Sequence, residues 1–325
     1  MRRLLIAAAV MLLLAGCDLP LGLGFATTRE LEDGALSTLA SAKSLEVSGS
    51  YVEQSEHWVI DVQVVRPRSK HAVVQRNGVR LEAIVIGADR YFRSPQVLAD
   101  QLSADQASRD LAQAAGSAWW TGLAVPDSNP FDFTDAAVLR ATLINSDLAT
   151  RRDRVTVNGV ETAHLSSAGA DVYIEEAAPH HLVRLQMRIS KVVEGISQAD
   201  LLFNHYGADF KIAAPHDVIN FGDLSTLPPE YTVVSVDTSG CATPCVVQAT
   251  VKNLGGRKGA KAPSTVTFQM TDLVSGKAIG GCTGTVAPDV DYNATTTVSC
   301  AIAEAAGADF AGAKVTATPT NPGHV

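Results

Sequence analysis

The stretch HWVIDVQVV, residues 57–65, decides the fold because its apolar side chains recur at every second position. Four of these side chains share one face of an extended chain: Trp58, Ile60, Val62 and Val64. The opposite face carries polar side chains between two valines. A period of two with one mainly apolar side is typical of a β-strand that buries one face. We therefore expect this strand to belong to an antiparallel sheet with one main core side.

The segments around this strand predict an α+β fold. Further strands are expected at residues 44–54, 71–76, 80–86, 90–93, 154–157, 160–165, 171–175 and 181–190. The dipeptides Asn77–Gly78 and Asn158–Gly159 predict hairpin turns. Apolar residues at helical spacing predict helices within 26–43, 95–118 and 135–148. This order favours a curved antiparallel sheet with helices on one face, and residues 83–86, apolar on both sides of their strand, predict a part covered twice.

A second region begins after Pro228–Pro229. It consists almost entirely of short predicted strands, at residues 231–236, 246–253, 264–271, 283–286, 295–301 and 314–319. Turn-forming residues recur between these strands at the spacing of a β-sandwich. We therefore predict one domain at 30–228 and an all-β immunoglobulin-like sandwich at 229–325.

The first 17 residues, MRRLLIAAAVMLLLAGC, predict export. Two arginines precede an apolar run that is too short for a permanent membrane helix and suits a signal-peptide core. The last four residues, LAGC, resemble the lipobox of bacterial lipoproteins, in which the cysteine is lipidated. We expect a signal peptide at 1–16, a lipid anchor at Cys17 that holds the chain on the extracytoplasmic face of the cell membrane, and a tether at 17–29.

Charge excludes one class of partner. Removal of residues 1–16 from the 325-residue chain leaves 309 residues, and the formal net charge moves from −8 to −10 because two arginines leave. Binding to a nucleic acid backbone depends on clustered Lys and Arg side chains. We therefore expect no nucleic acid partner.

Four cysteines near the C-terminal end predict disulfides: Cys241, Cys245, Cys282 and Cys300. Their even number fits an oxidising compartment. Three pairings are open to them, and we favour Cys241 with Cys245 and Cys282 with Cys300. A zinc site is the rival interpretation, but the spacings C-x3-C and C-x17-C fit no common zinc finger. We predict no metal and no cofactor.

Catalytic signatures are missing from the sequence. The chain contains no G-x-S-x-G, H-E-x-x-H, Walker or G-x-G-x-x-G motif. The pair His180–His181 follows Pro179 and is interpreted as a surface turn, because adjacent strand residues point to opposite faces and do not converge on one metal. We expect a protein that is not an enzyme.

Several short segments in this order resemble the LppX/LprG group of actinobacterial lipoproteins, which is similar in fold to the LolA and LolB lipoprotein carriers. The segments are AKSL at 42–45, Trp119–Trp120, the hairpin TVNGVET at 156–162, FNHYG at 203–207 and IAAP at 212–215. The resemblance covers roughly residues 30 to 220. It implies a half-barrel, a curved antiparallel sheet wrapped around helices, with an apolar cavity that accepts acyl chains.

The resemblance turns a set of apolar residues into candidates for the lining of that cavity. They are Ile60, Val62, Val64, Val73, Ile84, Ile86, Tyr91, Leu98, Leu102, Trp119, Trp120, Leu123, Val183, Leu185 and Met187. Our leading hypothesis is a membrane-anchored lipoprotein that binds or carries a lipid or lipidated molecule in this cavity. The alternative is a filled scaffold whose C-terminal sandwich binds another envelope protein or the cell wall.

Overall fold

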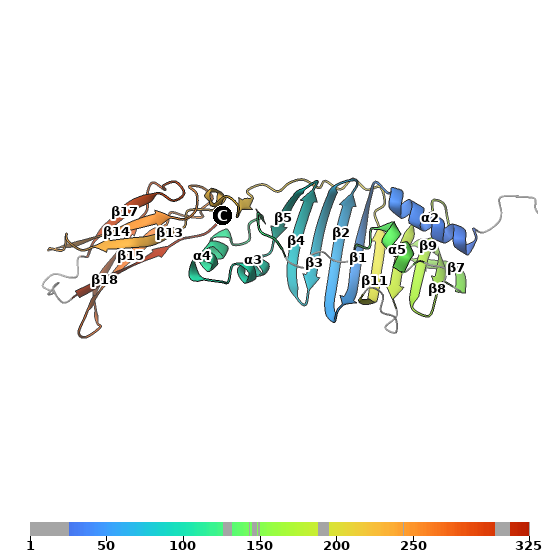
Figure 1. Cartoon of the computed structure of the whole chain (residues 1–325), viewed down its shortest axis with the longest axis horizontal. Helices are drawn as coiled ribbons and strands as arrows, with labels where there is room; N and C mark the ends of the chain where they lie inside the picture. Colours follow the sequence, from blue (N-terminus) through green and yellow to red (C-terminus); the bar gives the residue numbers. More distant parts are fainter. Residues whose placement is uncertain are drawn as a thin grey trace, which may run out of the picture. The chain divides into compact units, whose positions relative to one another are not determined.

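The computed structural model describes residues 26–125, 132–142, 144, 148, 150–187, 195–242, 244–302 and 313–324 (Figure 1). The predicted signal peptide and Cys17 lie outside these residues. The chain divides into two compact units. The first comprises Met1–Ala42, Val47–Ser55 and Phe131–Tyr206, and the second comprises Lys43–Glu46, Glu56–Pro130 and Gly207–Val325. The boundary expected between residues 228 and 229 falls inside the second unit, and the proposed domain division stays a prediction.

The first unit combines two helices with antiparallel strands. Its elements are α2 (Thr28–Ser41), most of β1 (Ser44–Glu53), α5 (Ala136–Thr142), β7 (Thr150–Val157), β8 (Val160–Ser166), β9 (Ala170–Glu175), β10 (Leu182–Met187) and β11 (Ile196–Asn204). The strand order is β1-β11-β10-β9-β8-β7. The sequence pattern predicts all of these strands except β11. In β11 the positive φ of Gln198, 53°, interrupts the two-residue period, so that the buried residues Ile196 and Ala199 stand three apart.

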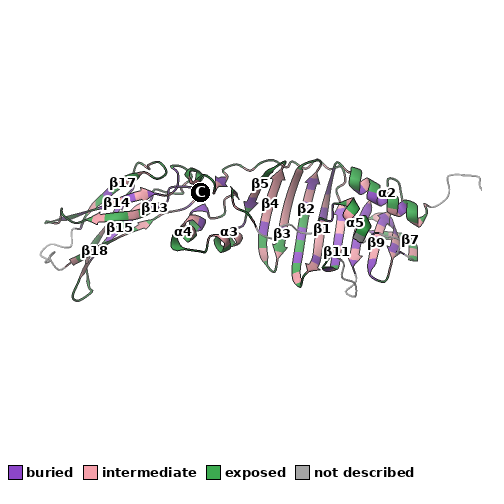
Figure 2. Ribbon diagram, in the orientation of Figure 1, coloured by how far each residue is buried: buried purple, intermediate pink, exposed green. Residues whose placement is uncertain are grey.

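Helix α2 starts and packs as its sequence predicts. Thr27 and Glu30 form a capping box, which satisfies two backbone N–H groups at the helix start. Leu31 and Leu39 are 1% and 0% exposed, and the helix packs against α5, β9 and β10. Buried residues also lie along the strands of the sheet (purple in Figure 2). Leu165 of β8, for example, is 0% exposed. The two helices and the side of the sheet that α2 covers therefore form the hydrophobic core of the first unit.

The second unit begins with a row of hairpins. Its first strands are β2 (Glu56–Val65), β3 (Ser69–Arg76), β4 (Val79–Ile86), β5 (Asp89–Arg93) and β6 (Trp120–Thr121). The order β12-β6-β5-β4-β3-β2 includes the short β12 (Ile219–Asn220), which runs parallel to β6. Asn77 and Gly78 both have positive φ, 47° and 90°, so the predicted turn between β3 and β4 is confirmed.

Two helices occupy the region predicted to be helical at 95–118. They are α3 (Pro95–Gln101) and α4 (Gln106–Ala115). The chain breaks between them because Asp105 starts a new helix: its carboxylate accepts a hydrogen bond from the backbone N–H of Ser108 at 2.7 Å. A short 3-10 helix, η1 (Leu224–Thr226), precedes the proline pair.

The C-terminal part of the second unit is a β-sandwich. Its strands are β13 (Tyr231–Asp237), β14 (Cys245–Asn253), β15 (Thr265–Asp272), β16 (Ala278–Thr285), β17 (Thr295–Ile302) and β18 (Ala313–Thr320). They form two three-stranded sheets, β13-β14-β17 and β16-β15-β18. Buried side chains of both sheets, among them Val247 and Phe268, share one core. The predicted sandwich is thus present, whereas its immunoglobulin-like identity stays a prediction.

The secondary-structure content supports the α+β class. Strands make up 49% of the described residues and helices 15%. Within the described ranges, no helix combines the length and the apolar character needed to cross a membrane.

Candidate functional site

The register of β2 to β5 gives this part of the sheet two faces of different chemistry. Residues directly opposite each other on antiparallel strands point to the same side. One side carries the row Val62, Ala72, Ala83 and Phe92, and the next row adds Ile60, Val74 and Leu81. We call this side the apolar face. The other side, the polar face, is crossed by the row Asp61, Val73, Glu82 and Arg93.

The register divides the predicted lining residues between these faces. Ile60, Val62 and Val64 lie on the apolar face and are 3%, 6% and 7% exposed. Four others lie half-buried on the polar face: Val73, Ile84, Ile86 and Tyr91. The expectation of one shared lining is therefore wrong for these four. All of residues 83–86 are half-buried, so the expected double covering of that segment is also wrong.

The remaining predicted lining residues of the second unit differ in how far they are buried. Leu98 and Trp120 are buried, and the Trp120 ring lies 5.1 Å from the ring of Phe92 on the apolar face. Trp119 is half-buried, with the Arg93 guanidinium of the polar face 4.7 Å from its ring centroid. The last two predicted residues, Leu102 and Leu123, are also half-buried.

The three predicted residues on β10 belong to the first unit. Leu185 and Met187 are buried at 0% and 5% exposure, in the core that α2 covers. A register shift after Leu182 places that residue, and not Val183, opposite Ile174. The predicted alternation is therefore interrupted at Val183, which is 7% exposed.

The apolar face becomes less buried toward one end of its strands. Near α3, which packs against β4, Val74 and Leu81 are buried. Further along the face, Ala72, Ala83 and Val85 are half-buried. The last paired row consists of Val64, Lys70, Val85 and Arg90. The apolar surface therefore ends beside two cationic side chains, and Arg90 is exposed.

The polar face is held by a charged network. Glu82 accepts hydrogen bonds from His71 at 2.9 Å and from the Arg93 Nε at 3.1 Å, and Arg93 forms an ion pair with the same carboxylate. Partial burial of Glu82 opposes its ionisation, but the hydrogen bonds from Arg93 and His71 outweigh burial and lower the pKa of Glu82. This face is thus stabilised by fixed charges and is a poor surface for an acyl chain.

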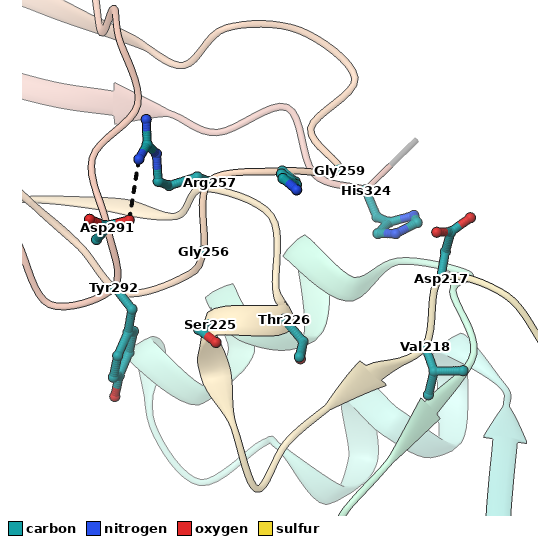
Figure 3. Close-up of a pocket in the computed structure, with 11 residues that line it drawn as sticks. Asp217, Val218, Ser225, Thr226, Gly256, Arg257, Gly259, Asp291, Tyr292 and His324 are labelled. Atoms are coloured by element: carbon teal, nitrogen blue, oxygen red, sulfur yellow. Dashed lines mark ion pairs between the residues drawn. The ribbon is translucent and has the colours of Figure 1, made fainter.

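A separate cavity of about 620 Å³ lies in the second unit, beside the sandwich (Figure 3). Its walls come from Asp217–Val218, Ser225–Thr226, the loop Gly256–Gly259, Asp291–Tyr292 and His324. Arg257 and Asp291 form an ion pair across part of the wall at 3.5 Å. No sequence motif marks this pocket, because its walls come from five short segments spread between residues 217 and 324.

Asn253 and two glycines hold the loop of this pocket. The fully buried Asn253 accepts a hydrogen bond from the Gly255 N–H at 3.0 Å and donates to the Gly256 carbonyl at 2.8 Å. A Cβ on Gly255 would lie 1.9 Å from the Pro228 carbonyl oxygen, and one on Gly256 would lie 1.9 Å from that of Ser225. Only glycine permits this close approach of two backbones.

We expect Gly255→Ala to destabilise the loop by about 1–3 kcal/mol, because the Cβ displaces the backbone at Pro228. Hydrogen exchange of the Gly256 amide, which donates to the Leu227 carbonyl at 2.8 Å, measures the effect. Lys258→Ala, an exposed change in the same loop, is the control and should leave this exchange unchanged. Equal protection in Gly255→Ala and the native chain would contradict the expectation.

Both favoured disulfides are present. Cys241 is bonded to Cys245, and Cys282 is bonded to Cys300. The described residues contain no group of three or more His, Cys, Asp or Glu side chains arranged to hold a metal ion. His180 has a positive φ of 64° and donates its N–H to the Ala177 carbonyl at 2.9 Å, which confirms the predicted turn after Pro179. Both histidines are half-buried, so the expected surface position is not confirmed.

Comparisons with known proteins find only distant structural similarity. No protein-family model and no curated protein matches the chain. A crystal structure of MucB in complex with MucA(peri) matches 89% of this chain and 98% of its own, with 10% identity and a TM-score of 0.27. A structure of the Pseudomonas aeruginosa MucA/MucB complex matches 86% of this chain and 96% of its own, with 10% identity and a TM-score of 0.26. The class therefore rests on the structure itself: an α+β protein with a disulfide-containing β-sandwich.

Proposed function

We propose that the chain is a non-catalytic lipoprotein, anchored through Cys17 to the extracytoplasmic face of the membrane, that binds the acyl part of a lipid or lipidated molecule on the apolar face of β2 to β5. The observation that carries this proposal is the row structure of that face. Its two central rows contain no charged residue, whereas the rows at its ends do: Arg76 lies beside Trp58 at one end, and Lys70 and Arg90 lie at the other. An acyl chain needs an uncharged surface of this kind, and a cationic end suits a headgroup.

The two disulfides support the proposed compartment. Disulfides form and persist outside the cytoplasm and are rare inside it. The lipobox-like LAGC at 14–17 supplies the anchor in this proposal. The resemblance to the LppX/LprG group supports the same location and the same class of ligand.

Two neighbouring residues on β4 test the lipid site. Ala83 lies in a central row of the apolar face, between Ala72 and Phe92, whereas Ile84 lies on the polar face, and both are half-buried. We expect Ala83→Glu to reduce co-purified lipid by about tenfold or more, because a carboxylate in an acyl contact costs more than about 1.4 kcal/mol. Ile84→Glu adds the same charge to the other face and should leave the lipid content unchanged.

The measurement is mass spectrometry of non-covalently bound lipid from the full chain processed in a native-like host. Organic extraction separates this lipid from the acyl groups expected on Cys17. Circular dichroism confirms that each variant is folded. Lipid-free native protein, or equal lipid in the native chain and a folded Ala83→Glu variant, would rule out the proposed site.

The alternative function, binding of an envelope protein through the sandwich, has its own support. Among the described residues, exposed large apolar side chains gather in the sandwich region: Val234, Val246, Leu273, Val274 and Tyr292. Val274 is 95% exposed and Leu273 is 64% exposed. Exposed apolar side chains of this kind are common at protein interfaces. This alternative is favoured if the native protein carries no lipid.

A further inference from the structure

The pocket of Figure 3 is independent of the lipid site and has the character of a small-molecule site. Its volume of about 620 Å³ lies within the range of about 300–1,000 Å³ typical of ligand pockets. Its wall is built before any ligand arrives, because Asn253 binds the Gly256 carbonyl at 2.8 Å and the Val290 carbonyl at 2.7 Å. A preformed wall lowers the ordering cost of binding.

The charges of the pocket balance. Arg257 forms an ion pair with Asp291 at 3.5 Å. Figure 3 shows the ring of His324 directed toward the carboxylate of Asp217. The lining thus contains two cations, Arg257 and Lys258, and two carboxylates, Asp217 and Asp291. A charged ligand would have to compete with the ion pair of Arg257 and Asp291, whereas an uncharged ligand with both donors and acceptors can bond to either sign.

The rest of the lining combines hydroxyl groups with an aromatic ring. Ser225 and Thr226 supply hydroxyl oxygens on one wall. Both hydroxyl groups donate to Asp223 within the loop, at 2.7 Å and 2.8 Å, so their oxygens are left as acceptors for a ligand. Tyr292 lines the pocket although 41% of it is exposed. The exposed ring of Tyr292 therefore offers an apolar surface inside a polar pocket. A ligand that is itself partly apolar and partly polar can contact both.

From the balanced charges, the hydroxyl groups and the exposed ring, we propose that this pocket binds an uncharged saccharide. A sugar ring presents an apolar C–H face, which suits Tyr292. Its hydroxyl groups both donate and accept hydrogen bonds, which suits Asp217, Asp291 and the cationic side chains. The ligand class is thus a neutral carbohydrate chain, of which one or two sugar units enter the pocket.

The experiment uses the full processed chain and a panel of uncharged oligosaccharides that includes N-acetylglucosamine and glucose trimers. Isothermal titration calorimetry measures affinity, and galacturonate and inorganic phosphate serve as charged competitors. We expect at least one neutral oligosaccharide to bind with a Kd of about 1 mM or tighter and not to be displaced by the charged probes.

Tyr292 provides a matched pair of variants. Tyr292→Ala removes the ring and should weaken binding by about tenfold or more, whereas Tyr292→Phe keeps the ring and should retain most of the affinity. Circular dichroism checks that both variants are folded. The proposal is overturned if no uncharged oligosaccharide binds the folded native chain, if a charged probe binds more tightly, or if a folded Tyr292→Ala variant binds like the native chain. The lipid content of the Ala83→Glu variant is a separate readout, so failure here leaves the lipid site untouched.

Discussion

The sandwich should lose stability as the pH rises from about 4.5 to about 7, and Glu230→Gln should remove most of that loss. Glu230 is 7% exposed, and burial raises the pKa of its carboxyl from 4.5 to about 7. A hydrogen bond from the Asn321 side chain at 2.8 Å lowers this pKa in part, and the negative charge of Asp110 raises it. The folded state therefore holds a proton that the unfolded chain releases at lower pH.

The direction of the effect follows from proton linkage. Below pH 4.5 the carboxyl is protonated in both states, so the contribution of Glu230 to stability is fully present. As the pH rises toward about 7, the folded state binds more protons than the unfolded state, and stability falls. The interval between the two pKa values corresponds to about 3 kcal/mol. Above this interval the folded carboxyl is ionised and the loss is complete.

Urea unfolding at several pH values, followed by hydrogen exchange of the β13 and β14 amides, measures this loss. Gln at position 230 stays neutral and keeps an oxygen that accepts from Asn321. Glu161→Gln, a change at an exposed carboxylate, is the control and should keep the native pH dependence. Equal pH dependence in Glu230→Gln and the native chain would contradict the assignment.

The contacts of Glu230 show which part of the sandwich should lose the most stability when its carboxyl ionises. Its backbone carbonyl accepts from the Leu254 N–H at 2.7 Å, and its side chain is close enough to Asp110 of α4 to feel that charge. The His324 N–H donates to the Ala114 carbonyl of the same helix at 2.9 Å. Ionisation of Glu230 should therefore weaken the contacts of α4 with the residues just before β13 and just after β18.

Local chemistry explains what the sequence could predict. The Asn77–Gly78 turn forms because both positions accept positive φ, independent of the rest of the chain. Helix α2 begins at its capping box because Thr27 and Glu30 bond to backbone groups within one turn. Trp58 and Ile60 are buried because β2 has a clean two-residue period.

Long-range pairing explains what the sequence could not predict. Ile84 and Val85 are both apolar, so alternation cannot assign their faces, and only the pairing of Ile84 with His71 and Tyr91 places it on the polar face. The saccharide pocket and Glu230 depend on contacts between distant segments, and no local motif marks either. The strand β11 is hidden because Gln198 shifts its period.

The disulfides should contribute unequally to the sandwich. Cys282 and Cys300 are 18 residues apart and join a strand of one sheet to a strand of the other. Cys241 and Cys245 are only 4 residues apart. In the chain-entropy model a longer closed loop restricts the unfolded chain more strongly, which gives about 3 kcal/mol for the longer loop and about 2 kcal/mol for the shorter one.

Reduction of paired variants separates these contributions. In Cys241→Ala/Cys245→Ala, reduction breaks the disulfide between the sheets and should cost about 3 kcal/mol, whereas in Cys282→Ala/Cys300→Ala it should cost about 2 kcal/mol. Because each variant is compared with itself before and after reduction, the packing lost at the buried Cys245 cancels. Hydrogen exchange of the β14 and β15 amides reports both losses. A larger loss in the variant that keeps only the short loop would show that native-state contacts, and not loop length, determine what each disulfide contributes.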